Sequence, residues 1–222
     1  MSKELVWDAI GERNYETGVR KVAVYPQDAI GAYPKGAAWN GISAITESPS
    51  GAESTKLYAD DGKYLDLTSA EEYGCTVEAY TYPDEFKPCN GETELTEGVT
   101  IGQQERQRFG LCYRTILGND TEGSKHGYIL HLVYGCKAAP SEKAHNTVND
   151  SPEATTMSWE ITTTPVDVTD HDPSATLTLD STKVPKAKMA AIEKVLYGSA
   201  DAEARLPLPN EVIEILNAAA AA

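Results

Sequence analysis

The sequence predicts a mainly β chain: an antiparallel β-sandwich or barrel flanked by one or two short α-helices. Three observations support this fold class. Apolar and polar residues alternate in several segments rich in β-branched and aromatic side chains, which is typical of strands with one buried face. These segments are short, and clusters of glycine, proline and asparagine separate them. Helical periodicity occurs in only a few places.

Alternation is clearest in four segments. Each places its apolar side chains on one parity, as a half-buried strand requires. These residues are Phe109, Leu111, Tyr113 and Leu117 in Arg108–Leu117; Tyr128, Leu130, Leu132 and Tyr134 in Tyr128–Cys136; Met157, Trp159 and Ile161; and Ala175, Leu177 and Leu179. Further strands are expected at Val19–Tyr25, Gly41–Thr46, Ser54–Tyr58, Thr76–Tyr82 and Gly98–Gln103.

Two of these strands, Arg108–Leu117 and Tyr128–Cys136, are expected to form a hairpin. The connecting segment, GNDTEGSKHG, is polar and rich in glycine, which suits an exposed loop. Its Asp120 and Glu122 raise the alternative of a calcium loop, but the spaced ligands and the terminal glutamate of such a loop are missing. We therefore expect an ordinary hairpin loop.

Helical signals occur at two places before the C-terminal segment. Leu67–Gly74 reads as one short helical turn, because Thr68 or Ser69 can cap it and its own glycine can end it. Pro185–Tyr197 is predicted to be a helix that stops at Gly198, with an apolar stripe formed by Met189, Ile192, Val195 and Leu196. This helix covers one open face of the sandwich or packs at a subunit boundary, and the sequence leaves both alternatives open.

The remaining segments are the C-terminal region and two long connections between strands. Asn210 is expected to cap a helix over Glu211–Asn217, and the alanine run that follows is expected to fray. Pro83–Glu97 and Lys137–Ala154 are too polar and too interrupted to be core elements, so we expect long loops that become ordered against neighbouring molecules. Residues 1–180 are predicted to form the β domain with an N-terminal arm, and residues 181–222 a C-terminal helix and arm.

Composition restricts the function. The chain has 222 residues and is 41% hydrophobic, which supports a packed core. Its 19 lysines and arginines against 34 acidic residues give a net charge of −15, the reverse of the basic footprint of a protein that grips DNA. Solubility alone explains an acidic chain, and so does a wall that repels phosphate. No run of about 18 apolar residues and no secretory signal is visible, so we expect synthesis in a cytoplasm without membrane insertion.

No chemistry-bearing motif is recognisable. Nucleophile-elbow, phosphate-loop, dinucleotide-binding and zinc-protease patterns are missing, so we expect no enzyme activity, no metal and no cofactor. The histidines lack metal-ligand spacing, and His131, within an apolar strand, is expected to be structural. Asp60–Asp61 and Glu71–Glu72 are read as solvated acids. The four cysteines are expected to be buried and reduced, with disulfides or a metal site as the alternatives: Cys75, Cys89, Cys112 and Cys136.

Tyrosine is enriched, with 12 residues against 2 phenylalanines. Tyrosine suits surfaces that are partly wet and partly buried. A sandwich core with hydroxyl groups at its rim explains any single residue, whereas the excess as a whole favours an assembly surface. The tyrosines in or beside the predicted strands and loops are Tyr25, Tyr33, Tyr58, Tyr64, Tyr80 and Tyr82.

The stretch from Trp39 to Val166 resembles the core of major tail tube proteins of long-tailed, non-contractile bacteriophages. The resemblance rests on consecutive phrases, among them NGISAITESPSGAESTKLYADDGKYLDLTSAEEYG, TVEAYTYPDEF and GVTIGQQERQRFGLCYRTILGNDTEG, and continues in LTLDSTKV and RLPLPNEVIEIL. One local departure is STKVPKAKM, which carries Pro185 and basic residues where the family leads us to expect an acidic cap. That departure shifts the expected start of the helix.

The resemblance implies a fold and a function. The fold is a β-sandwich with a flanking helix, a long loop or hairpin and terminal arms, shared with the tubes of contractile tails and type VI secretion systems. Six subunits form a ring, and stacked rings form the tail tube of the virion, assembled in the bacterial cytoplasm. The implied partners are other copies, the tape measure protein, the tail terminator and the distal tail or baseplate proteins, with DNA passing through without specific binding.

An acidic lumen is the expected site. Glu78 and Glu160 are our lumen-facing candidates, because each lies on a strand among polar or mixed neighbours, where a carboxylate is tolerated only if the face is wet. Three alternatives belong to other classes of protein: a capsid decoration protein, an adhesin-like module and a hydrolase. The adhesin requires a secretion signal, and the hydrolase requires a catalytic site.

Overall fold

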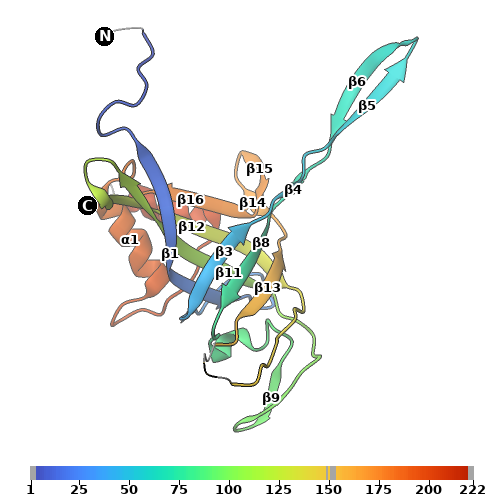
Figure 1. Cartoon of the computed structure of the whole chain (residues 1–222), viewed down its shortest axis with the longest axis vertical. Helices are drawn as coiled ribbons and strands as arrows, with labels where there is room; N and C mark the ends of the chain where they lie inside the picture. Colours follow the sequence, from blue (N-terminus) through green and yellow to red (C-terminus); the bar gives the residue numbers. More distant parts are fainter. Residues whose placement is uncertain (1–3, 149, 151–153, 220–222) are drawn as a thin grey trace.

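The computed structural model describes residues 4–148, 150 and 154–219 (Figure 1). The chain is mainly β and its strands pair antiparallel, as predicted. The strands are β1 Asn14–Pro26, β2 Ala37–Ala38, β3 Ile42–Glu47, β4 Ser50–Gly51, β5 Ser54–Ala59, β6 Gly62–Thr68, β7 Glu71–Glu72, β8 Gly74–Ala79, β9 Thr93–Thr96, β10 Val99–Ile101, β11 Phe109–Asn119, β12 Gly123–Ala138, β13 Met157–Thr162, β14 Val166–Val168, β15 His171–Ser174 and β16 Thr176–Asp180. The helices are a 3₁₀ turn, η1 Asp84–Phe86, and two α-helices, α1 Lys186–Tyr197 and α2 Pro209–Ala218.

The body consists of two connected sheets. The large sheet has the order β2-β1-β11-β12-β16, and the small sheet has the order β13-β8-β3. Strand β12 belongs to both, because its residues 129–133 pair with β16 whereas Lys137 and Ala138 pair with β13. Four two-stranded ribbons complete the β structure: β4-β7, β5-β6, β9-β10 and β14-β15.

Gly135 forms the corner at which β12 passes from the large sheet to the small one. Its φ of +61° lies in the left-handed region that glycine adopts without strain. A Cβ at this position would lie 2.2 Å from the carbonyl oxygen of Thr164. The surrounding hydrogen bonds fix the corner: the Gly135 N–H donates to the Tyr33 hydroxyl at 2.8 Å, and the Thr164 N–H donates to the Gly135 carbonyl at 3.1 Å.

The two sheets and the helices form three layers with two cores. One core lies between the large and small sheets and contains Phe109, Leu111, Tyr113, Val77, Trp159 and Ile161 among others. The other lies between the large sheet and the two helices and contains Tyr25, Cys112, Leu130, Leu132, Tyr134, Met189, Ile192 and Leu196 among others. The prediction that β11 and β12 are half-buried is therefore wrong, because both faces of these central strands are covered.

Most predicted strands are confirmed, and the β11–β12 connection is shorter than expected. The expected ten-residue loop is largely strand, since Asn119 and Gly123 still pair across the ladder. The Asn119 side chain explains the tight turn. Its Oδ1 accepts hydrogen bonds from the N–H groups of Thr121 at 3.2 Å and Glu122 at 2.6 Å, which replaces the missing ladder bonds.

The predicted helical turn at Leu67–Gly74 is wrong. Leu67 and Thr68 belong to β6, and Glu71 and Glu72 form β7. Cross-strand pairing explains the difference, because Thr55 lies opposite Leu67 and Ser50 lies opposite Glu72 in antiparallel register. A single helical turn offers one hydrogen bond for the residues it fixes, so the longer ribbon prevails.

Helix α1 has the predicted stop at Gly198, and Met189, Ile192 and Leu196 are buried against the large sheet. Helix α1 has no acidic cap: Pro185 precedes its first turn and makes no side-chain capping hydrogen bond. The predicted cap of the second helix is wrong. Helix α2 starts at Pro209, whose fixed φ suits a first helical position. Asn210 instead accepts a hydrogen bond at Oδ1 from the Thr169 N–H at 3.0 Å.

The segment Pro83–Glu97 contributes to the core, contrary to the prediction. Phe86 at the end of η1 is fully buried, and Cys89 is buried beside it. The Phe86 ring meets those of Trp39, Phe109 and Trp159 at centroid distances of 4.3, 5.3 and 5.5 Å. The polar composition hid two anchoring side chains, and the segment continues into strand β9 of a small exposed ribbon.

All four cysteines are free and buried, as predicted. Burial is the largest cause that raises the thiol pKa values, to about 12 for Cys75, Cys89 and Cys112. The thiols therefore stay protonated at neutral pH and behave as small apolar side chains.

The geometry at Gly135 predicts that Gly135→Ala strongly lowers the free energy of unfolding. Its matched control is Gly123→Ala, because Gly123 has a φ of +56° but no atom within 4 Å of the added Cβ. We expect the control to lose about 1–2 kcal/mol from left-handed strain alone. Gly135→Ala is expected to lose more than about 3 kcal/mol, since a backbone oxygen blocks the methyl group. Urea denaturation measures both, and equal losses would contradict the role assigned to the corner.

The buried thiols predict sensitivity to alkali. A group whose folded pKa is raised contributes its full stability below its unfolded pKa, near 8.5 for cysteine, and loses it as the pH rises. We expect the free energy of unfolding to fall between pH 8 and 10.5, with a slope that approaches about 1.4 kcal/mol per pH unit for each thiol above about pH 9.5. Denaturation curves at several pH values measure the slope. Cys75→Val removes one titrating group and should reduce it, whereas an unchanged slope would contradict this explanation.

Candidate functional site

The small sheet exposes one polar face. Glu78 lies opposite Ser158 in the β8–β13 ladder, and Glu160 lies opposite Thr76. Since neighbouring pairs of the same parity share a face, the two glutamates lie diagonally on the side away from the core. Glu78 is half-buried and Glu160 is exposed. The structure brings together the two residues singled out from the sequence, and whether a lumen lies on this side stays a prediction.

A projecting hairpin extends the small sheet. The β3–β8 ladder continues beyond Glu47 and Gly74, because the Ser48 N–H donates to the Gly74 carbonyl at 2.8 Å. It continues through the β4–β7 pairs and the Ser69 N–H, which donates to the Glu53 carbonyl at 3.0 Å. The ladder ends in the β5–β6 hairpin, which stands away from the body (Figure 1). We call residues 50–72 the arm.

The arm tip is a two-residue turn. Ala59 pairs with Gly62, so Asp60 and Asp61 are the turn residues, with φ values of +50° and +61°. This conformation matches a type I′ hairpin, in which both central residues have positive φ and aspartate is well tolerated. The sequence ADDG between alternating segments is the signal that sequence reasoning missed when it treated the two aspartates only as solvated acids.

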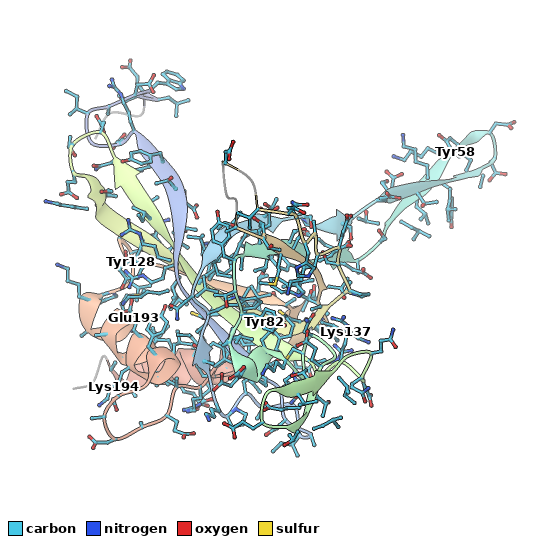
Figure 2. The ribbon with its side chains drawn as sticks, turned by 60° about the horizontal axis from the view of Figure 1, so that its bottom comes forward. Tyr58, Tyr82, Tyr128, Lys137, Glu193 and Lys194 are labelled. Carbon is cyan, nitrogen blue, oxygen red and sulfur yellow. The ribbon has the colours of Figure 1, made fainter. Side chains whose placement is uncertain are left out.

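The arm is amphipathic but covers nothing. Leu57 lies opposite Leu65, and Thr55 lies opposite Leu67, so the three leucines share one face of the ribbon. Leu57, Leu65 and Leu67 are 41%, 36% and 54% exposed, and Tyr58 also lies exposed on the arm (Figure 2). Every residue of β5 and β6 is exposed. A two-stranded hairpin alone is only marginally stable in water, and an exposed apolar face is typical of an interaction site.

Charge distinguishes the arm from an ordinary apolar patch. Residues 50–72 contain the carboxylates of Glu53, Asp60, Asp61, Asp66, Glu71 and Glu72 against the two cations Lys56 and Lys63. One ion pair, between Lys63 and Asp66, lies within it. A partner of the arm must therefore offer both apolar contact and positive charge.

Other exposed segments are smaller. Leu5, Trp7 and Ile10 near the N-terminus are 76%, 76% and 83% exposed, in a segment without regular structure. The second predicted long loop, Lys137–Ala154, begins inside β12, and its described residues from 141 to 148 are exposed, whereas residues 149 and 151–153 lie outside the described part. The terminal alanines 220–222, which we expected to fray, also lie outside it.

The tyrosines divide into two groups. Tyr25 and Tyr33 are buried in the core beneath the helices, where the Tyr25 hydroxyl donates to the Leu196 carbonyl at 2.7 Å. Tyr58 and Tyr64 on the arm are 70% and 71% exposed. Tyr80, directly after β8, is 55% exposed as well. The core explanation therefore fits the buried tyrosines, and the assembly surface stays a prediction for the exposed ones.

His131 is enclosed by aromatic and polar neighbours. Its ring stacks on Tyr113 at 4.5 Å with an interplanar angle of 4°, and its Nε2 lies 2.9 Å from the Thr115 hydroxyl. Burial lowers the pKa of His131, despite the nearby carboxylates of Glu16 and Glu47. A neutral, stacked imidazole between strands serves the packing of the β11–β12 pair.

Comparison with known proteins adds no assignment: no protein-family model matches the chain, and no curated protein matches it. Within residues 4–148, 150 and 154–219, no helix is long and apolar enough to cross a membrane. Over the same residues, no group of three or more histidine, cysteine or acidic side chains is placed to hold a metal ion. The surfaces described above therefore carry the functional argument.

Proposed function

We propose that this chain is the structural subunit of a tail tube, in which hexameric rings stack into a hollow tube that conducts viral DNA into a bacterial cell. The observation that carries the proposal is the arm. It is a ribbon that extends the small sheet, with three leucines exposed on one face and no described residue of the chain covering them. In a monomer such a ribbon exposes apolar surface to water, whereas in a polymer the same surface can pack against a neighbouring subunit.

Two further features support self-assembly. Strand β3 pairs with β8 alone among the described strands, so one edge of the small sheet is open to another chain. The sequence resemblance to major tail tube proteins supplies the kind of polymer, a ring of sandwiches with hairpins and arms between subunits. In that assembly the partners are other copies, with the tape measure, terminator and distal tail proteins at the ends, and the location is the virion tail.

The acidic outer face of the small sheet suits the wall of the tube. Glu78 and Glu160 lie there among threonine and serine side chains, and one cation, Lys137, lies opposite Thr162 at the β12 end of the same face. A ring repeats each carboxylate around the circumference, so that phosphates meet a repelling wall. DNA then slides without being bound, in agreement with the net charge of −15.

The arm predicts that assembly depends on its apolar face. The variant Leu57→Ser, Leu65→Ser, Leu67→Ser should fold normally, since these side chains touch no core, but should not form tubes. The control Lys56→Ser, Asp66→Ser changes the opposite face and should still assemble. Negative-stain micrographs of the concentrated protein decide the result. Tubes from the leucine variant would contradict the role of the arm. In micrographs of whole virions, finding this protein only on capsids would favour a decoration protein.

The wall predicts a salt-dependent effect on DNA passage. Glu78→Lys and Glu160→Lys should leave folding and assembly intact but slow DNA ejection at low ionic strength. The effect should weaken in salt, because the Debye length falls from about 30 Å at 0.01 M to about 8 Å at 0.15 M. DNA release from virions measures it, with Glu203→Lys, an exposed residue near helix α1, as control. Normal ejection by both variants at low salt would remove these residues from the proposed wall.

A further inference from the structure

A basic pocket lies at the junction of β1, β11, β12 and α1. It is half open to solvent and has a volume of about 560 Å³. Five cations line it, Arg20, Lys21, Arg114, Lys125 and Lys186, together with a single carboxylate, Glu193. The chain as a whole has 19 lysines and arginines against 34 acidic residues, so the excess of positive charge at this pocket is opposite to the net charge of the molecule. Ile116, Met189 and Ala190 supply apolar surface to the same pocket.

Two of the five cations are engaged by the protein itself. The Arg114 guanidinium lies 3.4 Å from the centroid of the Tyr128 ring, and its Nη1 lies 3.3 Å from Glu193 Oε1. The Lys21 ammonium lies 5.2 Å from the centroid of the Tyr197 ring. The side chains of Arg20, Lys125 and Lys186 make no hydrogen bond or ion pair with any residue that the structure describes. Three positive charges are thus available to an incoming anion.

The backbone of β1 is irregular where it borders the pocket. Strand β1 has register shifts on both sides of Arg20, and Lys21 has a φ of +50° in the middle of the strand. A non-glycine residue in this region is uncommon and strained. Bulges of this kind redirect side chains, and here they place Arg20 and Lys21 at the rim of the pocket.

We propose that this pocket receives the acidic arm tip of a neighbouring copy, with Asp60 and Asp61 against Arg20, Lys125 and Lys186. Neither aspartate makes a side-chain hydrogen bond or ion pair among the described residues. A two-residue turn is small enough for a pocket of this size, which lies within the range that encloses compact ligands. The flanking Tyr58 and Tyr64 rings are exposed and can meet the cations and the apolar surface.

The contact has to join two copies. Tyr58 on the arm and Tyr128 and Glu193 at the pocket lie at opposite ends of the molecule (Figure 2). One surface patch that binds a different patch on the next copy makes a head-to-tail contact, which generates rings or stacks rather than a closed pair. Nucleic acid is a weaker candidate for the pocket, because the net charge of −15 opposes its approach.

Cross-linking between two full-length variants tests the inference, which rests on the proposed self-assembly. One chain carries Ala59→Cys beside the arm turn, and the other carries Lys125→Cys in the pocket or Glu203→Cys as an exposed control. The native cysteines are buried, so a short bis-maleimide labels the introduced thiols. We expect mixed dimers with Lys125→Cys and not with Glu203→Cys.

A second variant pair tests the charge. Asp60→Asn, Asp61→Asn keeps residues that tolerate the turn and removes both charges, and it should slow assembly by about tenfold or more at low salt but not at high salt. Lys125→Glu, Lys186→Glu should do the same. Tubes without pocket cross-links would overturn the inference and leave the proposed function standing. Cross-links without tubes would support the inference and reject the tube. If the pocket variant loses only binding of inorganic phosphate or of a DNA duplex, the arm is not the occupant and the inference fails.

Discussion

The corner at Gly135 is the constraint on which the architecture depends. Strand β12 can pair with the large sheet and then with β13 only because one residue without a side chain adopts a φ of +61° against the Thr164 carbonyl. The Tyr33 hydroxyl and the Thr164 N–H bind the two polar groups of the same glycine. With this turn in place, the small sheet lies over one face of the large sheet and leaves the other face to the helices.

The corner also determines what remains exposed. Covering both faces of β11 and β12 uses the apolar side chains of the central strands, so the outer face of the small sheet carries small polar residues, two glutamates and Lys137. The β3–β8 ladder has no covering layer beyond Glu47 and Gly74, and the chain continues there as a bare ribbon. The fold thus separates a packed body from a projecting ribbon whose side chains are exposed.

Sequence reasoning found the strands and missed what depends on distant contacts. Alternation identified β11, β12 and β13, and the glycine stop and apolar stripe identified α1, because these signals are local. It did not find that β11 is buried on both sides, since its second layer comes from helices about 75 residues later. Phe86 was hidden in a polar segment, and the arm was hidden because its turn was read as isolated acids. Parity alone placed Glu78 and Glu160 each on a wet strand face, whereas the side that they share follows from the β8–β13 register.

An unfolded arm would be easier to explain in a monomer than the ordered ribbon observed. Its ladder is continuous with the body, so its direction is set by β3 and β8 rather than by its own marginal stability. Such an extension presents the leucines and the aspartate turn in a defined geometry, which lowers the ordering cost that a flexible segment incurs on binding. The strained β1 bulge beside the basic pocket also costs stability in the single chain, and the contact between copies that we propose would offset the cost of both features.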